Sequence, residues 1–384
     1  MNRDIKIITI VSAIFGLCSG MFSILFTLYL DDLNISFLTM GAIFSVSGLL
    51  SFFVMIFVGV QSDVWGRKIV YSASLLLASI SRFLVPFFTG VGELTMVKIV
   101  QDLALRARTA IHPTFVFEHM KEGYAKLIAR IQGIELIFSA TGSLIVGSAL
   151  LYLGYQGSFI LVGLILFVAF IIFQFVRESN WPKVERKSIN EMYRFDISRQ
   201  LKLICGLNFI HGTGFSISHS VFIFTLFFRN KFALDPLALS LVVGLHHFAF
   251  GPPMLILSRI FDNPNLNYKK VTMIGTLLTG VPMIISVLIP SLIPAYAIWL
   301  LHDVIGASIR APALQTLTQS YSRDESRGKD TNMTSAFRNI GMIIGPVIGG
   351  YLADININFP FLIGGIIIVL GTLILIPLNR TVDS

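Results

Sequence analysis

The stretch that decides the fold is Gly59-Val60-Gln61-Ser62-Asp63-Val64-Trp65-Gly66-Arg67-Lys68, a short polar hairpin between two long apolar runs. The runs cover about 35–58 and 69–89, and each is long enough to cross a bilayer as a helix. Asp63 ends the first predicted helix, and Arg67-Lys68 begin the second. Gly59 permits close approach of another helix and Gly66 permits a sharp turn. The stretch therefore predicts two membrane-spanning helices joined by a tight charged turn.

The composition extends this interpretation to the whole chain. Hydrophobic residues make up 54%, charged residues 13%, and the mean hydropathy is +0.79. An ordinary soluble domain carries roughly 25% charged residues, so we predict an integral membrane protein whose first apolar run is retained as a span. The net charge of +8 is spread over short loops, which indicates membrane topology and no nucleic-acid partner. Cys18 and Cys205 lie inside apolar runs and are expected to be packed thiols.

Apolar segments of spanning length recur along the chain and predict an all-α membrane protein. We expect spans at about 5–30, 35–58, 69–89, 93–116, 127–152, 156–176, 199–228, 237–260, 270–290, 293–317, 333–353 and 359–378. The only long hydrophilic connector is 177–198, which we interpret as a cytoplasmic linker. The predicted domains are therefore 1–176 and 199–384, with six spans each.

The basic residues predict the orientation. Of the 29 Lys and Arg residues, only Arg229 and Lys231 fall in loops on one side, and the loops there also carry Asp31, Asp32 and Glu93. By the positive-inside rule, we expect both termini to be cytoplasmic in a multi-pass protein of the plasma membrane.

An internal repeat relates the two halves. Phe26–Leu30 recurs as Phe224–Phe228, and Pro113 recurs as Pro312, with offsets near 200 residues. Other matches at this offset pair Asp63 with Asp262, Glu135 with Arg338, and 142–147 with 345–350. A steady offset predicts two six-helix halves in parallel arrangement.

The pattern G-x-x-x-D-x-x-G-R-K resembles the signature loop between the second and third helices of the major facilitator superfamily. Gln61 stands where that family has a small or aliphatic residue. The resemblance covers essentially the whole chain and implies twelve helices in two pseudo-symmetric bundles that rock around a central cavity. It also implies a conformational latch made of Gly59, Asp63, Gly66, Arg67 and Lys68. The alternative is a hairpin whose positive charges only fix the topology.

A glycine-rich motif lies in the eleventh predicted helix. It comprises Gly341, Gly345, Pro346, Gly349 and Gly350. The motif resembles the antiporter motif of drug:proton exchangers, which belongs in the fifth helix, where this chain has glycines but no proline. We therefore predict a helix-packing role for it.

Ionisable residues inside predicted spans are functional candidates, because burying charge in a membrane is costly. The fourth span holds Lys98, Gln101 and Asp102, with Lys98 and Asp102 on one helical face. Glu135 lies in the fifth span, and its counterpart Arg338 lies in the eleventh. Asp102 corresponds roughly to Asp303. Arg82 is expected to snorkel or to pair structurally.

Histidines gather in the second half. His211, His246, His247 and the His302-Asp303 pair are predicted near mid-membrane. They could form a proton relay or bind a divalent transition metal, or each imidazole could hydrogen-bond between helices. No fixed ligand spacing supports a metal, so we predict neither a metal nor a cofactor.

The chain contains no P-loop, HExxH motif or nucleophile elbow, so we predict a transporter and not an enzyme. The leading hypothesis is proton-coupled efflux of a small molecule by a monomer, with Asp102, Glu135, Asp303 and either His211 or His302 as carriers. The alternatives are a divalent metal or cation exporter and a non-transporting sensor or scaffold on the same fold.

Overall fold

The computed structural model describes residues 3–120, 124–178, 197–263, 265–322 and 327–378, apart from some side chains within these ranges. The described residues form helices and connecting turns, with no strand among them. Seven of the described helical stretches are long and apolar enough to cross a membrane, and three shorter ones are also apolar. The predicted all-α membrane fold is confirmed.

Two compact units are distinguished by their internal contacts. The first comprises residues 1–35, 43–186 and 234–247, and the second comprises 36–42, 187–233 and 248–384. Most of the predicted linker 177–198 lies outside the described residues, so the domain boundaries stay a prediction.

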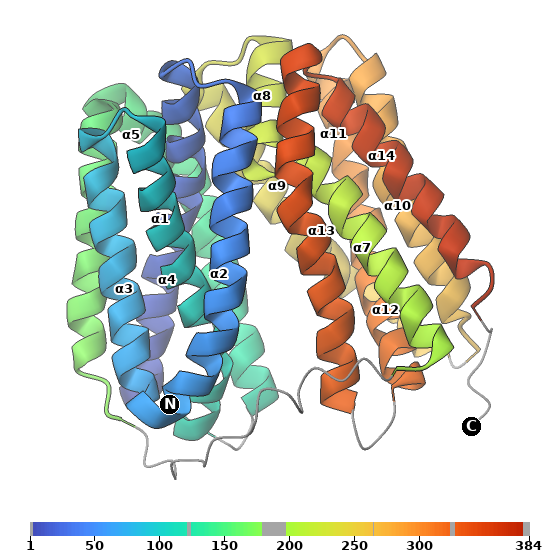
Figure 1. Ribbon diagram of the computed structural model, residues 1–384, viewed down its shortest axis with the longest axis horizontal. Helices are drawn as coiled ribbons and strands as arrows, with labels where there is room; N and C mark the ends of the chain where they lie inside the picture. The colour runs from blue at the N-terminus through green and yellow to red at the C-terminus, as the bar shows by residue number, and fades with distance from the viewer. Residues whose placement is uncertain (1–2, 121–123, 179–196, 264, 323–326, 379–384) are drawn as a thin grey trace. The chain divides into compact units, whose positions relative to one another are not determined.

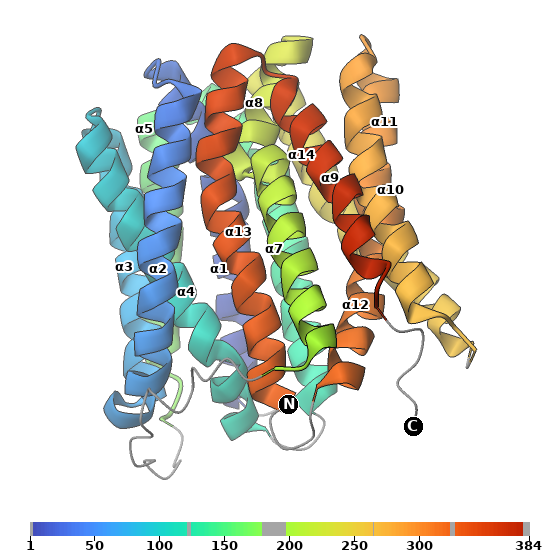
Figure 2. The same cartoon turned by 45° about the vertical axis from the view of Figure 1, so that its right-hand side comes forward.

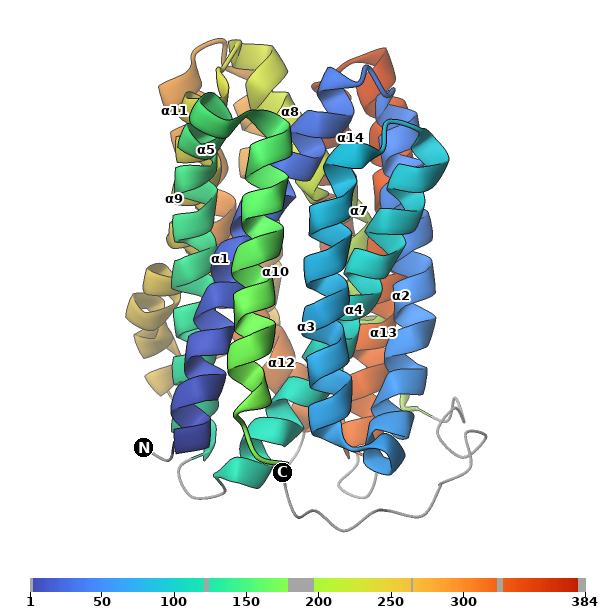
Figure 3. The same cartoon turned by 90° about the vertical axis from the view of Figure 1, so that its left-hand side faces the viewer.

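The helices of the first unit follow the apolar runs (Figure 1). They are α1 (Arg3–Asp32), most of α2 (Phe37–Trp65), α3 (Arg67–Leu84), α4 (Val91–His119) and α5 (Tyr124–Gln174). Helix α1 packs along α5, and α3 packs against both α4 and α5, as Figure 3 shows for α3 and α4. Gly154 interrupts α5 with a φ of 63°, which lies in the gap between the predicted fifth and sixth spans. Glycine reaches this conformation without the steric cost of a Cβ.

The second unit is built around α7 (Arg199–His219) and α13 (Arg327–Ile355), which lie side by side in Figures 1 and 2. Around them lie α8 (Val221–Phe232), the end of α9 (Pro236–Leu257), α10 (Tyr268–Leu288), α11 (Leu292–Leu301), α12 (Ser308–Tyr321) and α14 (Phe359–Gly371). Helix α10 contacts both α12 and α14, and α14 also contacts α7.

Two predicted spans are not regular helices. The span expected at 199–228 breaks at Ser220, whose ψ of 138° ends α7 before α8 begins. The span expected at 293–317 contains a π-helical turn at His302–Ala307 between α11 and α12. Hydropathy reports where the chain is apolar but not whether its backbone hydrogen bonds run without interruption, so these breaks were not predicted.

Candidate functional site

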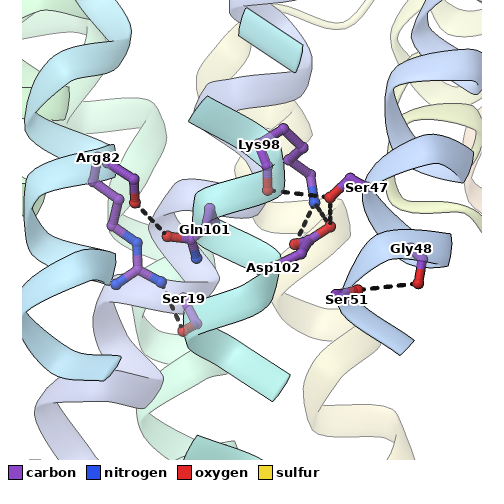
Figure 4. A network of polar contacts seen from close by, with 9 residues as sticks. Ser19, Ser47, Gly48, Ser51, Arg82, Lys98, Gln101 and Asp102 are labelled. Atoms are coloured by element: carbon purple, nitrogen blue, oxygen red, sulfur yellow. Dashed lines mark hydrogen bonds and ion pairs between the residues drawn. The ribbon is translucent and has the colours of Figure 1, made fainter. Parts of the chain in front are cut away.

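The first polar cluster joins α2 and α4 in the first unit (Figure 4). Lys98 Nζ lies 2.5 Å from both carboxylate oxygens of Asp102, one helical turn further along α4. Ser47 of α2 donates a hydrogen bond to the same carboxylate and lies 3.1 Å from the carbonyl oxygen of Lys98. The Lys98 ammonium also lies 4.7 Å from the ring centre of Phe44. A largely buried ion pair thus forms part of the contact between two helices.

Gln101 belongs to a neighbouring set of contacts. Its side-chain carbonyl accepts a hydrogen bond from Ser81 of α3 at 3.0 Å. Arg82, which follows Ser81 on α3, is fully buried. Its guanidinium donates a hydrogen bond to the Ser19 hydroxyl at 3.1 Å and lies 5.3 Å from the ring centre of Phe22. Of the two roles expected of Arg82, the structure therefore has the structural pairing and not the snorkelling to water. A hydroxyl and aromatic rings hold its guanidinium inside the unit.

A second ion pair centres on Arg108, which was not among the predicted site residues. Arg108 donates two hydrogen bonds to Glu135 at 2.9 and 2.7 Å, and others to Tyr71 and Ser12 at 3.0 Å each. Its guanidinium lies 4.0 Å from the ring centre of Phe15. The arrangement connects α1, α3, α4 and α5. One sequence signal could have found Arg108: another arginine, Arg310, lies 202 residues later in the corresponding helix, close to the repeat offset.

The charged turn after α2 makes contacts within the first unit. Gly66 has a φ of 96°, in the region that glycine adopts without strain. Arg67 forms an ion pair with Glu118 at the end of α4, and Lys68 donates to the carbonyl of Gln174 at 3.0 Å. Gly59 and Asp63 lie on helix α2, but the Asp63 side chain is outside the described part of the structure. The latch role stays a prediction.

In the second unit, the candidate histidines His211 and His302 are connected through the rings of Phe215 and His219. His302 Nε2 lies 3.2 Å from Asp303 Oδ1, and His302 Nδ1 lies 2.5 Å from the carbonyl of Trp299. The ring of His219, which was not a candidate, lies 4.3 Å from that of His302. His211 stacks on Phe215, with ring centres 5.8 Å apart.

His246 and His247 belong to the first unit. Their ring centres are 5.7 Å apart, and His247 Nδ1 lies 3.0 Å from the Ser143 hydroxyl. The hydrogen bond between helices that was one of the open interpretations is therefore present for His247.

The glycine motif of α13 faces α7. A Cβ on Gly345 would lie 2.5 Å from Ser216 Cβ, and one on Gly341 or Gly349 would meet the backbone of Phe209 or Ile217. Gly350 approaches the backbone of Phe37, and Pro346 is buried in α13. At these positions α7 and α13 are too close for a side chain.

Comparisons with known proteins agree with this architecture. The Major Facilitator Superfamily profile matches residues 8–265 and 204–384. The chain is 23% identical to "Multidrug resistance protein 2" of Bacillus subtilis (strain 168), over 89% of this chain and 87% of that protein. It is 26% identical to "Multidrug resistance protein MdtG" of Salmonella paratyphi C, over 85% and 82% of the two chains.

A solved structure shares the fold. A mutant of the nucleoside transporter NupG superposes with a TM-score of 0.81 at 13% identity, covering 97% of this chain and 98% of that one. At that identity the likeness concerns the fold alone. With the profile match along the chain and the helical membrane architecture, the chain belongs to the Major Facilitator Superfamily of transporters.

Proposed function

We propose that this protein exports small organic compounds across the plasma membrane in exchange for protons, by alternating access. The multidrug resistance names of two relatives support organic compounds as the substrate class. The distribution of basic residues supports cytoplasmic termini, and the proposal takes the working unit to be a monomer.

The observation that carries the proposal is the Lys98–Asp102–Ser47 cluster. The Asp102 carboxylate accepts hydrogen bonds from the Lys98 ammonium and the Ser47 hydroxyl. A proton that binds Asp102 weakens its attraction to Lys98 and converts the carboxylate from acceptor to donor. Because Ser47 lies on α2 and Asp102 on α4, protonation changes a contact between two helices, which is how a proton can favour one conformation over another.

Glu135 and Asp303 are the other proposed proton carriers. The residues around each carboxylate indicate how suitable it is for the coupling step. Arg108 is held by Tyr71 and Ser12 as well as by Glu135, so a neutral Glu135 would leave a buried guanidinium without its carboxylate. Asp303 lies beside His302, which can pass on a proton. We assign the main coupling step to Asp102.

Proteoliposomes with an imposed pH gradient test this proposal. Ethidium should be moved against its gradient by the wild-type protein, with a matching movement of protons. Asp102→Asn should abolish uphill transport yet retain downhill exchange of ethidium, because the substitution removes coupling and not the transport path. Unchanged uphill transport in Asp102→Asn would contradict the assignment, and an absence of driven flux with any dye would contradict the proposed function.

One observation favours a second candidate, export of a divalent metal as substrate. The rings of His219 and His302 have centres 4.3 Å apart, and His302 lies 3.2 Å from the Asp303 carboxylate. Imidazole with carboxylate suits a transition metal. Zinc flux that is lost in His302→Ala, while ethidium flux is absent in the wild type, would select this candidate. A His246→Ala/His247→Ala variant tests the other two histidines in the same assay.

A further inference from the structure

Arg310 is a buried cation of the second unit. Its counterpart in the first unit, Arg108, pairs with a carboxylate, and Arg310 has no such partner among the described residues. Arg310 lies in α12 and is 5% exposed. Its Nε has no hydrogen-bond partner among the described residues, and no described carboxylate pairs with it. An unpaired buried charge is costly, so the position requires an explanation.

The internal repeat shows which partner of Arg108 has no equivalent beside Arg310. In the first unit, Arg108 is neutralised by Glu135 and covered by the ring of Phe15. Arg310, Arg338 and His211 lie 202, 203 and 196 residues after Arg108, Glu135 and Phe15, close to the offset of the repeat. A second basic residue replaces the carboxylate, and an imidazole replaces the phenyl ring.

Helix packing confirms that the positions correspond. A Cβ on Gly16 in α1 would collide with the backbone of Glu135 in α5, and a Cβ on Gly212 in α7 would collide with the backbone of Arg338 in α13. The same close helix contact therefore supports the correspondence of Glu135 with Arg338, and it brings Arg338 next to the residue that follows His211 on α7.

The three second-unit residues share one neighbourhood. Arg310 and Arg338 both act electrostatically on His211, and Arg338 also acts on Arg310. Helices α7, α12 and α13 contact one another. Each residue lies about 16–18 Å along its helix from the end at which α7 and α13 begin and α12 ends, at a rise of ~1.5 Å per residue.

His211 and Arg338 differ in what they offer a ligand. His211 is 2% exposed, and neither ring nitrogen has a hydrogen-bond partner among the described residues. Arg338 is exposed, so one side of the group remains open. Two guanidinium groups and an imidazole with unused hydrogen-bonding capacity match an oxyanion, because arginine binds carboxylate and phosphate through paired N–H donors.

We propose that Arg310, His211 and Arg338 form an anion subsite that binds the carboxylate or phosphate group of an organic substrate. The subsite rests on the proposed transport function and narrows it: the substrates include amphiphilic organic anions. The first unit has no equivalent subsite among its described residues, because Glu135 occupies the corresponding place as an internal anion.

Binding to the purified full-length protein tests the subsite without transport. The probes are 2-naphthoate, 1-naphthyl phosphate and the neutral 2-naphthamide, and the readout is the melting temperature at increasing probe concentration. A ligand that binds the folded state raises this temperature in a saturable way. We expect both anions to do so and 2-naphthamide to have no effect. A response to only one anion would identify carboxylate or phosphate as the preferred group.

Arg310→Gln should weaken anion binding at least tenfold, whereas Arg106→Gln removes the same charge from the first unit and should leave binding unchanged. If Arg310→Gln does not fold, anion binding is measured in Arg338→Gln instead. Arg338 is exposed, so this substitution should leave the protein folded. Equal stabilisation by 2-naphthamide, or wild-type anion binding in the folded variant, would overturn the subsite.

Measurements of transport distinguish a failure of the anion subsite from a failure of the proposed export function. Driven efflux of ethidium, with no binding of either anion, would retain the transporter and overturn the subsite. Anion binding without any driven flux would retain the subsite and overturn the proposed export.

Discussion

The Arg108–Glu135 pair provides the most direct test of how the first unit is held together. Glu135→Gln keeps the shape of the side chain but removes its charge, and leaves Arg108, 3% exposed, with neutral partners only. Two charge-assisted hydrogen bonds at 2.7 and 2.9 Å are affected. Breaking a fully buried pair costs about 3–5 kcal/mol. The Glu135 side chain is 26% exposed, and Tyr71, Ser12 and Phe15 still contact Arg108, so we expect a loss of about 2–3 kcal/mol.

A double-mutant cycle measures the interaction itself. Arg108→Met, Glu135→Gln and the double variant are compared by reversible unfolding in mixed micelles of detergent and SDS. The double variant should be more stable than the sum of the two single losses predicts, with a coupling energy of about 2 kcal/mol. Arg106→Met, which removes a charge two residues away on α4, serves as the control and should change stability by less than about 0.5 kcal/mol. Additive losses within the experimental error would refute this reasoning.

Three further predictions concern packing and backbone conformation. Gly345→Ala should reduce thermal stability and transport because its Cβ would lie 2.5 Å from that of Ser216, whereas Gly133→Ala, with no atom within 4 Å of the added Cβ, should be neutral. Equal melting temperatures for the two variants would contradict the assignment of close packing between α7 and α13. Gly66→Ala should cost about 1–3 kcal/mol because its φ of 96° with a ψ of 132° is a conformation that essentially only glycine adopts. A melting curve equal to that of the wild type would show that the turn relaxes. Cys18 and Cys205, 0% and 3% exposed, should resist a membrane-impermeant maleimide until the protein is unfolded. Rapid modification of either thiol, detected by intact mass, would contradict their burial.

The fold was predictable because hydropathy is a local property that the sequence records directly. The apolar runs located the helices, and the repeated motifs revealed two related halves. Gly66 was also predictable, because the residues on either side of it require a tight turn. Partner choice depends instead on which helices meet. Lys98 and Asp102 were predictable as a pair because they lie one turn apart on the same helix.

Partners on different helices were not predictable in the same way. The partner of Glu135 is Arg108, and that of Arg67 is Glu118, and neither pairing follows from spacing along one helix. The histidines show the same limit. Similar depth suggested one cluster, but depth does not show which rings lie between its members. His302 lies beside His219, and Phe215 stacks on both His219 and His211.

The π-helical turn at His302–Ala307 has a consequence for the residues that follow it. Such a turn holds one residue more than an α-helix of the same length, and each residue of an α-helix advances the side-chain direction by about 100°. The turn therefore sets the rotational phase of α12 relative to α11. Deleting one residue from it would turn Arg310 by about 100° around the axis while leaving Trp299 in place. A single-codon deletion in this turn would thus also reorient the guanidinium of the proposed anion subsite.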